Sequence, residues 1–199
     1  MAWTELTEVD RLVLDRWSEV RGLLDAYRQV QDRIEERIET IEERLQRWAK
    51  EQGYEIAVDA KQAVISAYLP SWFDKRRGAR VCLVLGDFCP LGYRKVGAQY
   101  PYLAVYAGNL ENFKIRREGR LDFAEALRQQ LGEQAKEWHD PAVDDAENPL
   151  WRDLREYDER VRCALAADPA KLYEFAVKHL PELFQLSGFI SAALERLPK

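Results

Sequence analysis

Along the first third of the chain, apolar residues recur alternately four and three positions apart without a slip. The thirteen positions of this seam, eleven of them apolar, are Leu6, Asp10, Val13, Trp17, Val20, Leu24, Tyr27, Gln31, Ile34, Ile38, Ile41, Leu45 and Trp48. A hydrophobic repeat of this kind keeps one face of a helix turned toward a partner helix. The pattern predicts a long coiled-coil helix over residues 1–52, whose seam must be covered by another element.

Two partners for this seam are open. One is the same helix of a second chain, in a homodimer through residues 6–48 whose register is fixed by the polar seam residue Gln31. The other is the helical C-terminus of the same chain. Extra apolar residues at Leu12, Leu14 and Leu23 widen the stripe in the first half. We therefore expect that half to touch more than one neighbour, and residues 34–48 to be the cleaner coiled coil.

At Gly53 the period changes from helical to alternating, and glycine there favours the end of a helix. Four segments then read as strands, namely 54–59, 63–69, 80–85 and 102–107, with 112–115 as a further short edge. Their connections are polar or contain glycine or proline, which favours an antiparallel meander.

Helical periodicity returns after residue 121. It predicts helices over 122–138 and 150–167, then a helix capped by Asp168 with Pro169 in its first turn, and a last helix from Pro181 to 197. The sequence thus predicts an α+β fold with the long helix at 1–52 and an α+β domain at 53–199. In that domain a small, mainly antiparallel sheet of about four strands (54–120) precedes a layer of helices (121–199).

Composition places the chain among soluble globular proteins. Hydrophobic residues make up 47% and charged residues 33%, which excludes disorder. No apolar run approaches the ~20 residues of a membrane span, and the N-terminus lacks the pattern of a signal peptide. Three cysteines are too few for a disulfide framework. We expect a cytoplasmic protein with no membrane partner.

Charge is distributed unevenly along the chain. The net charge is −5, but residues 1–53 carry −4, residues 54–120 carry +5, and residues 121–199 carry −6. A partner responds to local fields, so a basic middle inside an acidic protein is more informative than the total.

Most catalytic motifs are missing from the sequence. It has no Gly-rich phosphate loop of the P-loop or dinucleotide type and no G-x-S-x-G elbow. The two histidines, His139 and His179, read as side chains at helix ends beside the carbonyl dipole. Cys82 and Cys89 lack a second close pair for a metal. We expect no cofactor and no metal, and a protein that is not an enzyme.

Among enzyme classes, a magnesium nuclease fits the sequence best. Asp59-Ala60-Lys61 matches the acid-x-Lys tripeptide of restriction-enzyme-like nucleases, and Asp87 ends a later predicted strand. The earlier acid that such a site requires would have to come from the long helix, and no lysine follows two residues after Asp87. A turn at the end of a strand explains the tripeptide better.

Basic residues interleaved with aromatic ones fill the connections between predicted strands. The candidate nucleic-acid- or anion-binding residues are Lys75, Arg76, Arg77, Arg80, Arg94, Lys95, Lys114, Arg116, Arg117, Trp72 and Tyr93. Cations that meet phosphates, beside aromatic planes that stack on bases, are what a single-stranded nucleic-acid surface requires. The competing interpretation is that basic turns keep strand edges soluble and pair with the acidic helices.

Two binding functions follow from these features. The first is a coiled-coil protein whose basic, aromatic-rich sheet end engages nucleic acid or another anionic partner. The second is a protein–protein adaptor or oligomerisation module in which the long helix supplies the function.

Overall fold

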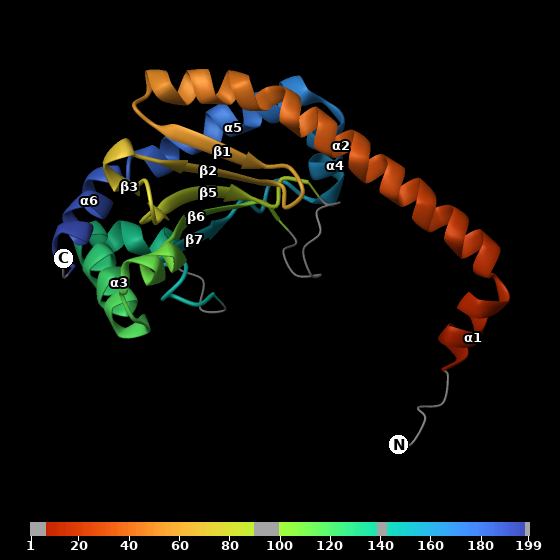
Figure 1. Cartoon of the computed structure of the whole chain (residues 1–199), viewed down its shortest axis with the longest axis horizontal. Helices are drawn as coiled ribbons and strands as arrows, with labels where there is room; N and C mark the ends of the chain where they lie inside the picture. Colours follow the sequence, from red (N-terminus) through yellow and green to blue (C-terminus); the bar gives the residue numbers. More distant parts are fainter. Residues whose placement is uncertain (1–6, 90–99, 139–142, 198–199) are drawn as a thin grey trace.

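The computed structural model describes residues 7–89, 100–138 and 143–197. The fold is α+β, as predicted: a long N-terminal helix and C-terminal helices pack on an antiparallel sheet (Figure 1). The α-helices are α1 (Glu8–Asp15), α2 (Trp17–Glu51), α3 (Arg117–Leu131), α4 (Glu159–Ala167), α5 (Pro169–Phe184) and α6 (Ser187–Glu195). The strands are β1 (Glu55–Asp59), β2 (Val64–Tyr68), β3 (Phe73–Asp74), β4 (Gly78–Ala79), β5 (Cys82–Gly86), β6 (Tyr102–Tyr106) and β7 (Leu150–Asp153).

The main sheet has five strands in the order β1-β2-β5-β6-β7, every neighbouring pair antiparallel. The four predicted strands are all present. The fifth, β7, corrects the predicted helix over 150–167, which begins only at Glu159. Leu150 pairs with Val105 and Trp151 with Ala104, so hydrogen bonding to the edge of β6 prevails over the helical tendency of these four residues.

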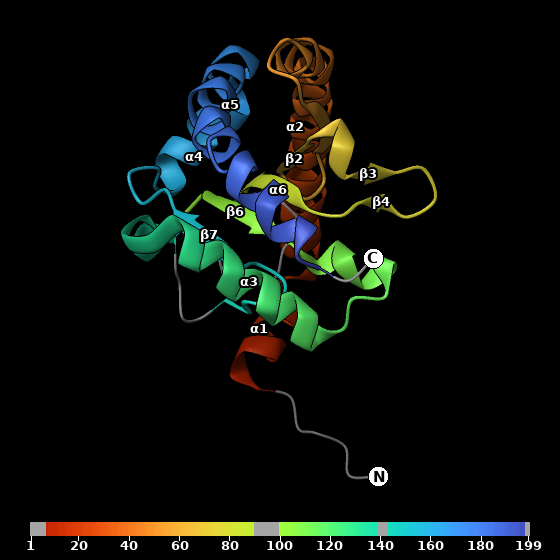
Figure 2. The ribbon, with the colours of Figure 1, turned by 90° about the vertical axis from the view of Figure 1, so that its left-hand side faces the viewer.

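One face of the sheet carries the main core. Figure 2 shows α2 and α5 side by side over this face, and they bury inward residues such as Ile65, Leu83 and Leu103. The opposite face holds a smaller cluster in which the Tyr102 ring stacks on Trp151 with centroids 3.7 Å apart. Alternation along each strand assigns its residues to the two faces.

The second half of the long helix packs on its own chain. Its seam residues Ile38, Ile41 and Leu45 are buried together with Ala49, against β1, α4 and α5. The expectation that residues 34–48 form the cleaner coiled coil is therefore wrong, because the sheet and the C-terminal helices already occupy this seam. The helix ends at Glu51, and Gly53 adopts φ +86°, as its glycine predicted.

The first half of α2 projects beyond the body, with α1 at its far end (Figure 1). The predicted continuous helix is broken at Arg16, whose backbone is not helical. Asp10, a polar residue of the predicted seam, belongs to the capping box that begins α1: its carboxylate accepts from the Thr7 N–H at 2.7 Å.

An apolar stripe runs along this projecting half. We define the apolar stripe as Trp17, Val20, Leu23, Leu24, Tyr27 and Val30. Among the described residues, eight of the twelve exposed large hydrophobic side chains lie between Val9 and Val30. So dense a run of exposed apolar side chains is unusual for a surface that faces only water.

Three further predictions differ from the structure in local detail. The predicted edge at 112–115 is instead a 3-10 helix (Gly108–Phe113), followed by Lys114 in a left-handed conformation. The helix predicted over 122–138 starts earlier, at Arg117, and ends at Leu131 because Gly132 (φ +57°) leads into a 3-10 segment. Pro181 does not open a new helix; it lies inside α5, which continues to Phe184.

The predicted start of α5 is confirmed. The Asp168 carboxylate accepts from the backbone N–H of Ala170 at 3.0 Å and of Lys171 at 3.4 Å, and Pro169 occupies the first turn.

Candidate anion-binding surface

A short hairpin presents the first group of predicted basic residues. Strands β3 and β4 flank the turn that contains Lys75, Arg76 and Arg77, and all three side chains are exposed. The Asp74 carboxylate accepts from the backbone N–H groups of Arg76 (2.8 Å) and Arg77 (3.0 Å), which lower its pKa. The carboxylate therefore fixes the backbone of the turn, while the three cationic side chains point outward.

The hairpin is anchored to the body through Trp72. This side chain is buried, and its indole N–H donates to the Ser191 hydroxyl of α6 at 3.1 Å. The backbone carbonyl of Trp72 accepts a hydrogen bond from the backbone N–H of Arg80 at 2.9 Å. Trp72 was predicted to contact a ligand, but its main role in the structure is to anchor the hairpin to α6.

Two arginines of this region converge on one aromatic ring. The guanidinium carbons of Arg77 and Arg80 lie 5.4 Å and 5.2 Å from the centroid of the Phe113 ring. At these distances each cation is attracted to the face of the ring. Lys114 follows Phe113 and is exposed, so residues nearly forty positions apart in the chain add their charges to one surface. We call Lys75, Arg76, Arg77, Arg80, Phe113 and Lys114 the basic hairpin surface.

Charge compensation separates two groups among the predicted cations. Arg117 pairs with Asp144 at 3.1 Å. Arg120, a further cation outside the candidate set, pairs with Glu111 at 3.3 Å. These two cations are thus paired within the chain, although not with the C-terminal helices: Glu111 lies in the 3-10 helix Gly108–Phe113 and Asp144 in the turn before β7. Within the described ranges 7–89, 100–138 and 143–197, none of the cations of the basic hairpin surface forms an ion pair with a side chain.

The remaining predicted residues are placed as follows. Arg116 is exposed at the N-cap of α3. Tyr93, Arg94 and Lys95 lie outside the described residues. The structure thus brings Arg77 and Arg80 together at Phe113, the residue before Lys114, and it pairs Arg117 with Asp144.

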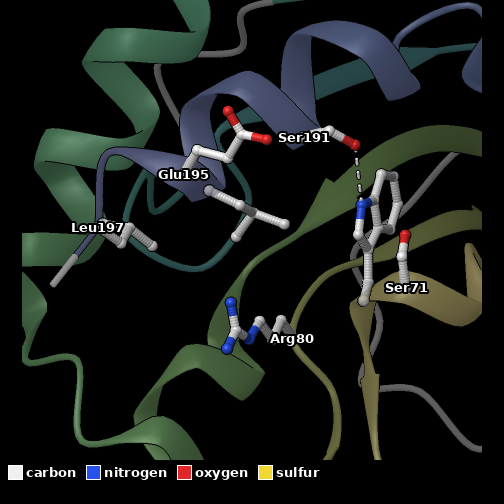
Figure 3. A pocket seen from close by; sticks show the side chains of 7 residues that line it. Ser71, Arg80, Ser191, Glu195 and Leu197 are labelled. Carbon is white, nitrogen blue, oxygen red and sulfur yellow. Dashed lines mark hydrogen bonds between the residues drawn. The ribbon is translucent and has the colours of Figure 1, made fainter. Parts of the chain in front are cut away.

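A pocket of about 640 Å³ opens beside the hairpin (Figure 3). The residues that line it are Ser71, Trp72, Arg80, Ser191, Leu194, Glu195 and Leu197. Figure 3 shows the Arg80 guanidinium on one side of the hollow and the Glu195 carboxylate and Ser191 on another. No sequence pattern pointed to Ser191 and Glu195, because they reach the pocket from α6, more than a hundred residues after Arg80.

A second hollow, of about 450 Å³, lies on the sheet face opposite α2 and α5. Tyr102, Tyr106 and Trp151 contribute its aromatic lining, and Asp59 and Glu147 are among its polar residues. Asp59 also caps its own turn, because its carboxylate accepts from the backbone N–H of Gln62 at 3.0 Å.

The nuclease hypothesis gains no support from this geometry. The register places Asp59 and Gly86 on either side of Val64, so Asp87 follows at the same end of the sheet. Asp87 is buried, however, and Asp59 holds a turn. In the part of the chain that the structure describes, no three histidine, cysteine or acidic residues gather in an arrangement that could hold a metal.

His179 has a different environment from the predicted helix end. Its buried ring lies inside α5, with Nδ1 2.9 Å from Glu182 Oε1 and Nε2 3.0 Å from the Tyr157 hydroxyl. Burial lowers the pKa of His179, although Glu182 opposes this shift. A neutral ring that donates from Nδ1 and accepts at Nε2 satisfies both contacts, so His179 ties α5 to Tyr157. His139, the other histidine, lies outside the described residues.

No protein-family model matches this sequence, and neither curated proteins nor solved structures provide a match. Within the described residues, no helix has the length and apolar character needed to cross a membrane.

Proposed function

We propose that this chain is a binding protein that holds a phosphate-bearing, single-stranded nucleic acid on its basic hairpin surface. The observation that carries the proposal is the convergence of Arg77 and Arg80 on the Phe113 ring, while neither guanidinium forms an ion pair with a side chain among the described residues. Phosphates are attracted to such a cluster, and a nearby aromatic plane, Phe73, is 46% exposed and stacks on Tyr68. Exposed planes beside cations favour unpaired bases over a duplex.

The pocket beside the hairpin supports the same proposal. Its volume suits a base or nucleoside, and Arg80 borders both the pocket and the basic hairpin surface. A strand whose phosphates follow the hairpin could therefore place one nucleotide against Trp72, Ser191 and Glu195.

The test is binding of labelled single-stranded and duplex oligonucleotides, followed by fluorescence anisotropy over a range of salt concentrations. A Lys75→Ala/Arg77→Ala/Arg80→Ala variant is expected to lose about tenfold or more in affinity, and its salt slope is expected to fall by about three. The wild type is expected to prefer the single strand.

The matched control removes three exposed cations elsewhere, in a Lys136→Ala/Arg155→Ala/Arg160→Ala variant. This control is expected to retain most of the affinity. An equal loss in both triple variants would assign binding to overall charge, and no binding by the wild type at low salt would overturn the proposal.

A second function, self-association through the N-terminal helix, is favoured by the apolar stripe. We infer that the chain forms a homodimer, because Leu23 is 72% exposed and Trp17 52% exposed on a projecting helix. Large apolar side chains in such a position are typical of a protein-binding surface.

Equilibrium sedimentation at micromolar concentration is expected to give twice the mass of one chain. Leu24→Asp, within the stripe, is expected to give one chain mass. Ala26→Asp adds the same charge on the polar side of the helix and is expected to leave the dimer intact. A monomeric wild type would contradict self-association and would leave the nucleic-acid proposal untouched.

A further inference from the structure

We infer that two copies pair antiparallel through the apolar stripe, so that α1 of each copy docks in a groove between α2 and α4 of the other. This inference rests on the proposed self-association and adds its orientation, register and second contact. It follows from where the helix is already covered by its own chain.

The apolar stripe and the buried seam lie on one face of α2. Tyr27, Ile34 and Ile41 are successive heptad positions, as are Leu24, Gln31 and Ile38. Ile38 and Ile41 are buried by β1, α4 and α5, whereas Leu24 and Tyr27 are uncovered. The body of the protein and any helix docked on the stripe must therefore lie on the same side of α2.

This placement excludes a long parallel pair. A second helix running parallel on the stripe would collide with the sheet and α5 of the first copy beyond Gln31 (Figure 1). The sheet and C-terminal helices of the second copy would also overlap those of the first. A helix running antiparallel reaches that point with its N-terminal end instead, so each body lies at an opposite end of the pair.

The spacing of the stripe sets the register. Its heptad positions Trp17, Val20, Leu24 and Tyr27 are symmetric about residue 22. Antiparallel pairing about that centre places Trp17 opposite Tyr27 of the second copy and Val20 opposite Leu24. Gly22 itself lies on the outer side, where an added Cβ would meet nothing within 4 Å.

Flanking charges favour the same orientation. A parallel coiled coil would bring Arg16 of each copy against Arg21 of the other, which makes two repulsive contacts. The antiparallel pair makes only one such contact, between the two Arg21 side chains. Each Arg21 is also partly neutralised by Asp25 of the same chain, at 4.0 Å.

The groove that receives α1 has a volume of about 370 Å³. Its lining is Val30, Arg33, Ile34, Arg37, Cys163, Ala166 and Ala167. One wall is fixed because the Arg37 guanidinium donates to the Ala167 carbonyl at 2.6 Å, at the C-terminal end of α4. In the register above, Trp17 of the second copy lies opposite Tyr27, beside this groove. Its α1 continues from there beyond the break at Arg16 and carries the exposed side chains Val9 and Leu12.

The available area fits a stable dimer. The eight exposed apolar side chains between Val9 and Val30, each about half exposed, together offer on the order of 800 Å² per chain, as much as a standard interface buries on each partner. Without α1 and the groove, this area falls short of that size.

Cysteine cross-linking in the full chain tests the orientation. In a Cys163→Ser background, Leu23→Cys is expected to form a disulfide dimer, since the two Leu23 positions flank the antiparallel axis. Trp17→Cys in that background is expected to stay uncross-linked, because an antiparallel pair places it opposite Tyr27. The other two cysteines, Cys82 and Cys89, are buried.

The docking of α1 has its own test. Leu12→Cys with the natural, exposed Cys163 is expected to form a covalent dimer that disappears in Leu12→Cys/Cys163→Ser. Cross-linking of Trp17→Cys but not Leu23→Cys would overturn the antiparallel arrangement and leave self-association standing. A dimer in which only the Leu12→Cys cross-link fails would overturn the groove contact, and a monomer in sedimentation would remove the basis of both.

Discussion

Replacing Leu45 by alanine is expected to lower the free energy of unfolding by about 2–5 kcal/mol. Leu45 is 0% exposed and belongs to the core that also holds Ile65 of β2 and Leu180 of α5. Truncation removes buried methyl groups and leaves a cavity that the surrounding structure fills only in part. Urea unfolding followed by circular dichroism measures the loss, which is expected to be independent of protein concentration.

Leu24→Ala is the matched control, because it makes the same change at an exposed position of the same helix face. Its effect on an isolated chain is expected to stay within about 0.5 kcal/mol. Any larger loss is expected to grow with protein concentration, as dimer formation stabilises the native state by mass action. Equal, concentration-dependent losses for both variants would contradict the division of the seam into an internal and an external half.

The heptad shows what such a pattern predicts and what it leaves open. The spacing correctly predicted a long helix and the face that it buries. It could not decide between partners, since the same apolar residues suit a second helix or a sheet of the same chain. Ile38 and Leu45 are covered by β1, which follows α2 directly, and by α5, with which the chain returns more than a hundred residues later.

Strand β7 shows a similar limit. Leu150 and Trp151 precede a helix, and the four residues of β7 (Leu-Trp-Arg-Asp) show no alternation of apolar and polar positions that would mark a strand. What makes the segment a strand is pairing with β6, a contact between residues nearly fifty positions apart. The basic turn could be found locally, whereas Phe113 as the shared ring and Glu195 as the opposite wall of the pocket depend on tertiary packing.

Gly86→Ala is expected to lower the free energy of unfolding by about 1–3 kcal/mol, because the added methyl group overpacks the sheet. Gly86 lies beside Tyr102 in the β5–β6 ladder, and a Cβ at this position would overlap the end of the Tyr102 ring. That ring is 2% exposed and stacks on Trp151, so it cannot turn away into solvent. Thermal or urea unfolding measures the loss.

Gly188→Ala in α6 is the matched control, since its Cβ would meet nothing within 4 Å. Alanine in place of this glycine, in the first turn of α6, is expected to leave stability unchanged or raise it by about 0.5–1 kcal/mol. A Tyr102→Val background tests the cause, because removing the ring is expected to abolish most of the Gly86→Ala loss. If the Gly86→Ala loss persists in the Tyr102→Val background, its cause is strain in the backbone of β5. Glycine at position 86 would then not be needed to make room for the Tyr102 ring that stacks on Trp151 in the second hollow.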